Sequence, residues 1–124
     1  MKGTEHLSVG KIGEQIACQF LVSRGFKIID TNVTRKCGEL DIVARNKKTG
    51  RIHIVEVKTV SGSVASAWGH PSENLTEQKI KKLERTCLVY IKENKIINWQ
   101  LDAILVWYEK SNSSAQIEYL THIV

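Results

Sequence analysis

Apolar residues recur every three or four positions in two stretches of the chain, which is the spacing of an amphipathic helix. In the first stretch, Ser8 has the side chain of a good N-cap and Gly25 is placed to end the helix. We therefore expect a helix over residues 8–23. Gly10 and Gly13 lie on or beside its apolar stripe, so a neighbouring backbone can approach the helix closely there.

A second helix is predicted from Thr76 to about Asn94, with Thr76 as its N-cap. Its buried side is expected to carry Ile80, Leu83, Cys87, Tyr90 and Ile91. The segment before it, residues 60–74, is rich in Ser, Gly and Ala and holds the only proline of the chain. We expect a long loop there, and loops of this length are often functional.

Shorter segments rich in β-branched residues predict five strands, over residues 26–31, 39–45, 51–59, 99–108 and 116–123. Residues 47–50 have turn character, so the second and third strands should form a hairpin with a four-residue loop. The last strand is expected at an edge. The order αβββαββ predicts an α/β fold in which helices flank a mixed central β-sheet, with residues 1–124 forming a single domain.

The predicted hairpin brings two acidic residues together. If Asn46 closes opposite Arg51, then Asp41 falls opposite Glu56, with fourteen residues between them in the chain. Residues directly opposed in antiparallel strands share a face, with Cβ atoms ~5 Å apart. A slip of one residue would separate the two carboxylates, so their meeting depends on this register.

The third strand also places a lysine beside Glu56. Strand alternation puts Ile52, Ile54, Glu56 and Lys58 on one face, where two apolar side chains are followed by an acid and a base. Burying a charge is costly unless the charge is paired or holds a metal. The chain has two further acid-x-Lys matches, but they lie in the helical stretch, where residues two apart do not share a face. The alternative is a solvated cross-strand charge cluster.

Carboxylates converging at a strand end are suited to a divalent cation. Mg²⁺ or Mn²⁺ takes oxygen ligands, and Mg²⁺ usually keeps several waters beside one or two carboxylates. Asp41 and Glu56 are the expected ligands, and the Val57 carbonyl can add another oxygen. Lys58 can position or deprotonate the attacking water and stabilise the developing negative charge. Asp41, Glu56 and Lys58 are therefore the candidate catalytic residues.

The charge balance bears on the partner. The net charge is +5 and the isoelectric point is near 9.2, which favours an anionic partner such as nucleic acid, although many small soluble proteins are equally basic. Three scattered cysteines and the lack of an apolar leader indicate a reduced, cytoplasmic protein. No apolar run reaches the roughly 18 residues that span a bilayer, so we expect no membrane association.

At this point the chain resembles a known group of proteins. Asp41 followed by Glu56-Val57-Lys58 resembles the PD-(D/E)xK, or restriction-endonuclease-like, nucleases, and more closely the YraN family of small bacterial proteins. The matching segments are Gly10-x-x-Gly13-Glu14 with Ala17, Leu21 and Gly25; Asn32; residues 38–44; and residues 55–59. Trp68-Gly69, Lys79 and Asp102 fit weaker family positions. The resemblance covers nearly the whole chain, but Thr31 and Val60 stand where the family usually has arginine.

This resemblance implies a restriction-endonuclease-like fold and a Mg²⁺-dependent endonuclease, a phosphodiesterase acting on DNA. The order of Glu14, Asp41, Glu56 and Lys58 is also similar to archaeal Holliday-junction resolvases, which implies branched or structured DNA and makes Glu14 a further metal ligand. Because many nucleases of this fold cut two strands as dimers, a homodimer is compatible with it. The alternatives are a non-catalytic nucleic-acid-binding module and an adaptor for a DNA-processing partner.

Three further residues are candidates for the site or for nucleic-acid contacts. Glu39 shares a strand face with Asp41, and its alternative is a structural or surface role. Lys79 can touch a phosphate or belong to a solvated helix face. Trp68 can stack on a base of a single strand or anchor the loop on the core. For Asp102, which sits between apolar neighbours, we expect a structural hydrogen-bonded role.

Overall fold

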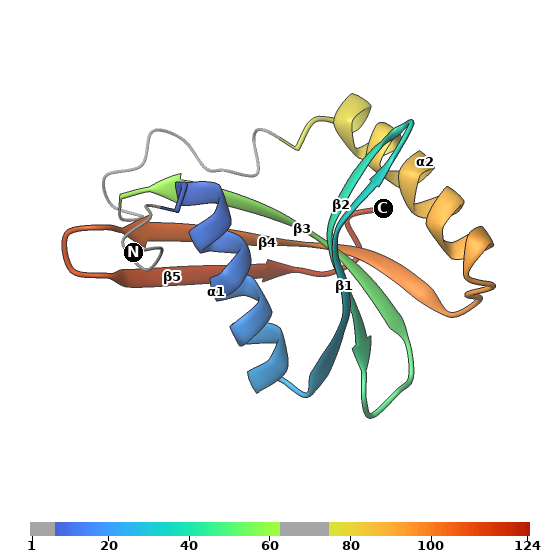
Figure 1. Ribbon diagram of the computed structural model, residues 1–124, viewed down its shortest axis with the longest axis horizontal. Coiled ribbons are helices and arrows are strands. Elements are labelled where there is room, and N and C mark those ends of the chain that lie inside the picture. Colours follow the sequence, from blue (N-terminus) through green and yellow to red (C-terminus); the bar gives the residue numbers. More distant parts are fainter. Residues whose placement is uncertain (1–6, 63–74) are drawn as a thin grey trace, which may run out of the picture.

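The computed structural model describes residues 7–62 and 75–124, which form two helices and five strands in the predicted order αβββαββ (Figure 1). The elements are α1 (Val9–Ser23), β1 (Phe26–Arg35), β2 (Gly38–Asn46), β3 (Ile52–Ser61), α2 (Glu77–Glu93), β4 (Trp99–Glu109) and β5 (Ser114–Leu120).

The strands form one sheet in the spatial order β1-β2-β3-β4-β5. β3 and β4 are parallel, because α2 carries the chain across between them, and the other neighbouring pairs are antiparallel. The α/β class with a mixed central sheet is therefore confirmed, as is the position of the last strand at an edge.

The two helices cover opposite faces of this sheet (Figure 1). Ala17 and Leu21 of α1 pack in one core cluster with Val55, whereas Cys87 of α2 packs in another with Ile54. Since Ile54 and Val55 are successive strand residues, their side chains point to opposite faces. β3 is thus buried from both sides over this stretch, and its charged residues begin where the burial ends.

Local capping sets the helix limits as the sequence predicted. The Ser8 hydroxyl accepts from the Lys11 N–H at 3.2 Å, and the Thr76 hydroxyl accepts from the Lys79 N–H at 3.2 Å. Gly25 follows α1 with a φ of 90°, a conformation that glycine adopts at little cost.

The strand ends were predicted less well. β1 continues to Arg35, because residues 33–35 pair with residues 38–40 of β2 across a tight turn. β3 continues to Ser61 by pairing with Tyr108, so the first residues of the predicted loop belong to a strand. β5 spans Ser114–Leu120 rather than 116–123.

The β2–β3 hairpin has the predicted register. The Asn46 N–H donates to the Arg51 carbonyl at 2.9 Å, and the ladder then runs up to the pair Ile42–Val55. This pairing places Asp41 and Glu56 at the next position along the two strands. The ladder stops one pair short of them, however, and this difference shapes the site.

Two further features of the described residues concern the cysteines and the length of the helices. Cys18, Cys37 and Cys87 are free thiols, and burial raises the pKa of Cys87 to about 12, so this thiol is unreactive. Over residues 7–62 and 75–124, neither helix is long and apolar enough to cross a membrane.

Candidate functional site

β2 and β3 separate at Asp41, and the side chain of Asp41 fills the gap between the two strands. We call this gap, which also holds Glu56, the fork. Beyond the pair Ile42–Val55, β3 stays paired only with β4, as far as Ser61. The Val57 N–H then faces β2 without a backbone carbonyl, and it donates to Asp41 Oδ2 at 2.8 Å. A carboxylate thus satisfies a backbone donor that the ladder leaves unpaired.

The alternation of β2 is also broken beside Asp41. Val43 packs in the α2-side core and Ile42 in the α1-side core, as alternation requires, but Leu40 packs in the α2-side core as well. Asp41 therefore lies at the rim of the sheet, with access to both sides. It lines a cavity of about 460 Å³ next to α1 and another of about 390 Å³ next to α2.

The carboxyl groups of Asp41 and Glu56 are in hydrogen-bond contact. Burial, followed by the hydrogen bond to Asp41 and by the charges of Asp41 and Glu14, raises the pKa of Glu56 to about 9, while the charge of Lys58 opposes this rise. At neutral pH Glu56 thus keeps its proton, in the hydrogen bond to Asp41. The register predicted this meeting correctly, although the contact is made by side chains beyond the last backbone pair.

This pair fits a divalent cation better than it fits two free charges. If the proton of Glu56 leaves, two negative charges remain in a half-buried fork, and a cation between them would replace it. Two carboxylates suffice for Mg²⁺, which keeps waters as its other ligands. Nowhere in residues 7–62 and 75–124 do three His, Cys, Asp or Glu side chains gather in a metal-binding group. A cation in the fork would thus have two carboxylate ligands, and Glu14 does not form a three-residue group with them in the described residues.

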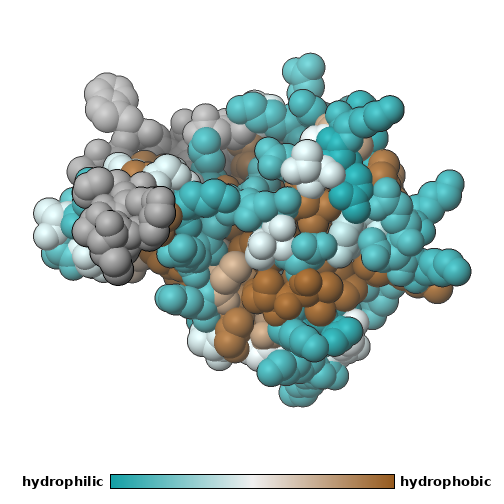
Figure 2. Space-filling model, in the orientation of Figure 1, coloured by the Kyte–Doolittle hydropathy of each residue, from teal (hydrophilic) through white to brown (hydrophobic). Residues whose placement is uncertain are grey.

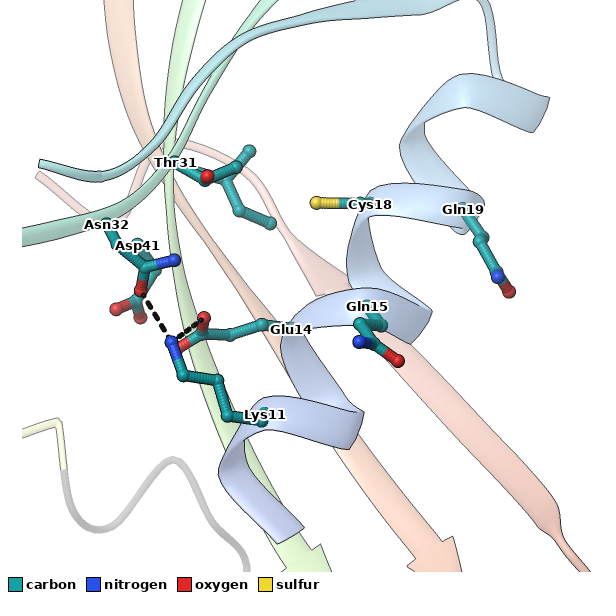
Figure 3. A pocket seen from close by; sticks show the side chains of 9 residues that line it. Lys11, Glu14, Gln15, Cys18, Gln19, Thr31, Asn32 and Asp41 are labelled. Carbon is teal, nitrogen blue, oxygen red and sulfur yellow. Dashed lines mark hydrogen bonds and ion pairs between the residues drawn. The ribbon is translucent and has the colours of Figure 1, made fainter. Parts of the chain in front are cut away.

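Glu14 lies across the α1-side cavity from Asp41 (Figure 3). Its carboxylate is 3.7 Å from the ammonium group of Lys11, which also donates to Asn32 Oδ1 at 3.4 Å. The close approach of α1 to β3 at Gly13, where a Cβ would overlap Thr59, determines how far Glu14 reaches toward the fork. The ligand role of Glu14 stays a prediction.

Lys11 and Asn32 are site neighbours to which the sequence reasoning gave no role. Asn32 has a φ of 51°, unusual for a residue other than glycine inside a strand, and such backbone outliers cluster at functional sites. The signal for Lys11 was its position three residues before Glu14, which puts both on one side of a helix.

The remaining predicted residues divide into three groups. Glu39 and Lys79 line the α2-side cavity together with Asp41 and Glu56, so the structure brings all four to one place. Val57 takes part through its N–H, and a role for its carbonyl stays a prediction. Trp68 lies outside the described residues.

Lys82 also lines this cavity and is a site neighbour that the sequence analysis did not identify. Its spacing of three residues from Lys79 on a helix could have identified it, because residues three apart are neighbours on a helix surface.

Asp102 belongs to a separate buried network. Its carboxylate lies 2.7 Å from His53 Nδ1 and accepts from Gln100 Nε2 at 2.8 Å and from the His122 N–H at 3.0 Å. Burial alone would raise the pKa of Asp102, but these bonds and one from the Tyr119 hydroxyl lower it below its ordinary value. The network joins three neighbouring strands, in keeping with the expected structural role.

The chain is similar in sequence to known proteins. Residues 13–106 match the model of the uncharacterised protein family UPF0102. UPF0102 proteins are 41% identical over 86 residues in Thermotoga maritima (69% of this chain, 73% of the relative) and 32% identical over 124 residues in Caldanaerobacter subterraneus (100% and 98%). Another from Rhodopirellula baltica is 33% identical over 108 residues, which cover 86% of this chain but 63% of that relative.

Among solved structures, a repair endonuclease from Pyrococcus abyssi is similar with a TM-score of 0.41 and 17% identity. The match covers 86% of this chain and 41% of that one. A similarity at this level says nothing about activity.

Proposed function

Because the chain belongs to the uncharacterised protein family UPF0102, the YraN family that its motifs resemble, we propose a function from the site itself. The proposed function is a divalent-metal-dependent endonuclease that acts on DNA, with branched or structured DNA as its substrate.

The observation that carries this proposal is the pair of carboxyl groups in the β2–β3 fork. Asp41 and Glu56 contact each other there, and Glu56 keeps a proton because its pKa is raised by burial. Asp41 lines cavities on both sides of the sheet, and Glu56 lines the one next to α2. They would hold Mg²⁺ or Mn²⁺ in place of that proton, with waters as further ligands. When bound, the cation lowers the pKa of a water and neutralises charge on a phosphate oxygen.

The surrounding residues orient this chemistry. The Val57 N–H anchors Asp41 and fixes the direction of its other oxygen. Lys58 follows Glu56 on the same face of β3, and its charge acts on that carboxyl group, which suits it to orient the attacking water and to stabilise the developing charge on the phosphate. Glu14 faces Asp41 across the α1-side cavity, beside Lys11, and would hold the cation as the further ligand that the resemblance implies.

A cleavage assay tests this assignment. Labelled duplex, single-stranded and four-way-junction DNA are incubated with the protein and Mg²⁺ or Mn²⁺. Asp41→Asn keeps an acceptor for the Val57 N–H but removes the charge, and Lys58→Ala removes the ammonium group. We expect each variant to lower the rate by roughly a hundred-fold or more. Lys47→Gln, in the β2–β3 turn, is the control and should cleave at the wild-type rate.

Unchanged cleavage in both Asp41→Asn and Lys58→Ala, with intact folding by circular dichroism, would refute the assignment. Mn²⁺ binding measured by calorimetry gives a second readout, since Asp41→Asn should weaken it while Lys58→Ala leaves it in place.

One observation favours a second candidate. Glu14 pairs with Lys11 at 3.7 Å, and two carboxylates of the described residues meet in the fork, so the same residues can serve a nucleic-acid-binding module that does not cleave. DNA binding that weakens steeply with salt, without turnover in any divalent ion, would support this module over the endonuclease.

A further inference from the structure

A groove leads away from the fork along α2. It consists of the α2-side cavity of about 390 Å³ and an adjoining cavity of about 860 Å³. The two cavities share Gly38, Glu39, Lys79 and Lys82, so they form one continuous depression, which we call the basic groove. One end holds Asp41 and Glu56, and the other is lined by Arg35, Lys36 and Arg85.

The groove has a fixed floor. α2 approaches β2 so closely that a Cβ on Gly38 would lie 2.8 Å from the Thr86 hydroxyl, and Thr86 itself is 1% exposed. The walls are the exposed side of α2 and the turn between β1 and β2, which lie side by side (Figure 1). The surface over this part of the molecule is mostly hydrophilic (Figure 2).

Positive charge dominates the groove. Five cationic side chains line the larger cavity against a single acid, Glu39; they are Arg35, Lys36, Lys79, Lys82 and Arg85. Arg35 is held by Glu93 at 2.8 Å. For the other four, no ion pair forms with any residue in the described part of the chain, whereas Lys81, on the same helix but outside the groove, pairs with Glu77 at 3.4 Å.

The spacing of these cations matches a strand of phosphates. Lys79, Lys82 and Arg85 recur every three residues, and together they span about 9 Å along the helix axis. One strand of duplex DNA carries a charge every ~3.4 Å of axis, so this length faces two or three phosphates. Lys79 lies in the first turn of α2, where the helix dipole also favours anions.

We propose that the basic groove binds the phosphodiester backbone of a DNA strand and leads it to the Asp41–Glu56 fork. The direction of the strand rests on the proposed function, but binding itself does not. The charged side chains contact phosphates rather than base edges, so this binding does not depend on base sequence.

The test is DNA binding without cleavage, measured by fluorescence anisotropy of a labelled oligonucleotide in EDTA over a series of salt concentrations. The variant is Lys79→Gln with Lys82→Gln. The matched control is Lys47→Gln with Lys48→Gln, which removes the same charge from exposed residues in the β2–β3 turn, at the far end of the hairpin from the fork. Thermal unfolding of both variants verifies their folding.

We expect the groove variant to weaken binding about ten-fold at low salt and to reduce the salt slope by about 1.4 to 1.8, the value for two lost phosphate contacts. The control should keep the wild-type slope. The proposal is overturned if the wild type does not bind, if the groove variant binds as the wild type does, or if both variants weaken binding equally.

Cleavage by the wild type and Asp41→Asn separates this proposal from the proposed function. If Asp41→Asn abolishes cleavage while the groove variant binds normally, the nuclease stands and the groove proposal fails. If no cation supports cleavage while only the groove variant loses affinity, the groove stands and the nuclease fails.

Discussion

Replacing Gly13 by alanine tests how α1 is held against the sheet beside the fork. A Cβ at this position would overlap the side chain of Thr59 on β3, at its Oγ1, Cβ and Cγ2 atoms. A Cβ on Gly10, one turn earlier, would meet only the Ser8 hydroxyl, at 4.0 Å. Because Gly13 precedes Glu14 and Thr59 follows Lys58, a displaced helix also moves Glu14 relative to the fork.

The expected energies of these two substitutions have opposite signs. Alanine is favoured over glycine inside a helix by about 1 kcal/mol, so Gly10→Ala should stabilise the protein by roughly 0.5–1 kcal/mol. Gly13→Ala has the same gain, but overpacking costs typically 1–3 kcal/mol and more where backbone must move. Since three atoms of Thr59 are overlapped, we expect a net loss on the order of 2 kcal/mol.

Urea denaturation, followed by tryptophan fluorescence, measures the free energy of unfolding of both variants. Thr59→Gly and the double variant Gly13→Ala, Thr59→Gly complete a double-mutant cycle. Thr59→Gly removes all three overlapped atoms, so Gly13→Ala should destabilise the Thr59→Gly background less than the wild type. We expect a coupling energy of at least about 1 kcal/mol between the two substitutions. If Gly13→Ala stabilises the protein as Gly10→Ala does, α1 does not contact Thr59 as described, and the reasoning about the position of Glu14 is wrong.

Other residues give further expectations. In EDTA, the raised pKa of Glu56, about 9 against an ordinary 4.5, stabilises the fold fully below about pH 4.5. This stability is lost as pH rises toward 9, at up to ~1.4 kcal/mol per pH unit. Denaturation at pH 5 to 8 measures the free energy of unfolding of the wild type and of Glu56→Gln. Equal slopes of this free energy against pH in both proteins would contradict the expectation. Asp102→Asn should cost on the order of 3 kcal/mol at pH 7, because His53 loses a buried charged partner; a loss below ~1 kcal/mol in urea would disprove this. Gly38→Ala should lower the melting temperature by several degrees, since its Cβ meets Thr86, and Thr86→Ser gives no relief because it keeps the hydroxyl.

The helix limits and the hairpin register could be predicted because local interactions set them. Ser8 and Thr76 cap their own helices, and the turn over residues 47–50 is closed by the bond between Asn46 and Arg51. The end of β1 could not be predicted in this way. The predicted strand stops at residue 31 because Asn32, a residue that is depleted in strands, comes next, so the local pattern gives no reason to extend it to residues 33–35.

The candidate site was predicted as a pair of residues, but not as a fork. Asp41 and Glu56 meet because the hairpin register carries them to the same level. That β3 leaves β2 at this level, and that the carboxylate of Asp41 takes up the free Val57 N–H, follows from the pairing of β3 with β4. β4 is some fifty residues away in the chain, and no local pattern reports its position.

The sequence by itself determined the order of elements, the caps and the register that joins Asp41 to Glu56, because each depends on residues close together in the chain. Only the tertiary structure decided the burial that keeps a proton on Glu56, the distance of Glu14 from the fork and the groove that α2 forms with the β1–β2 turn. These properties depend on which surfaces come together, since desolvation and summed charge arise only when remote segments pack.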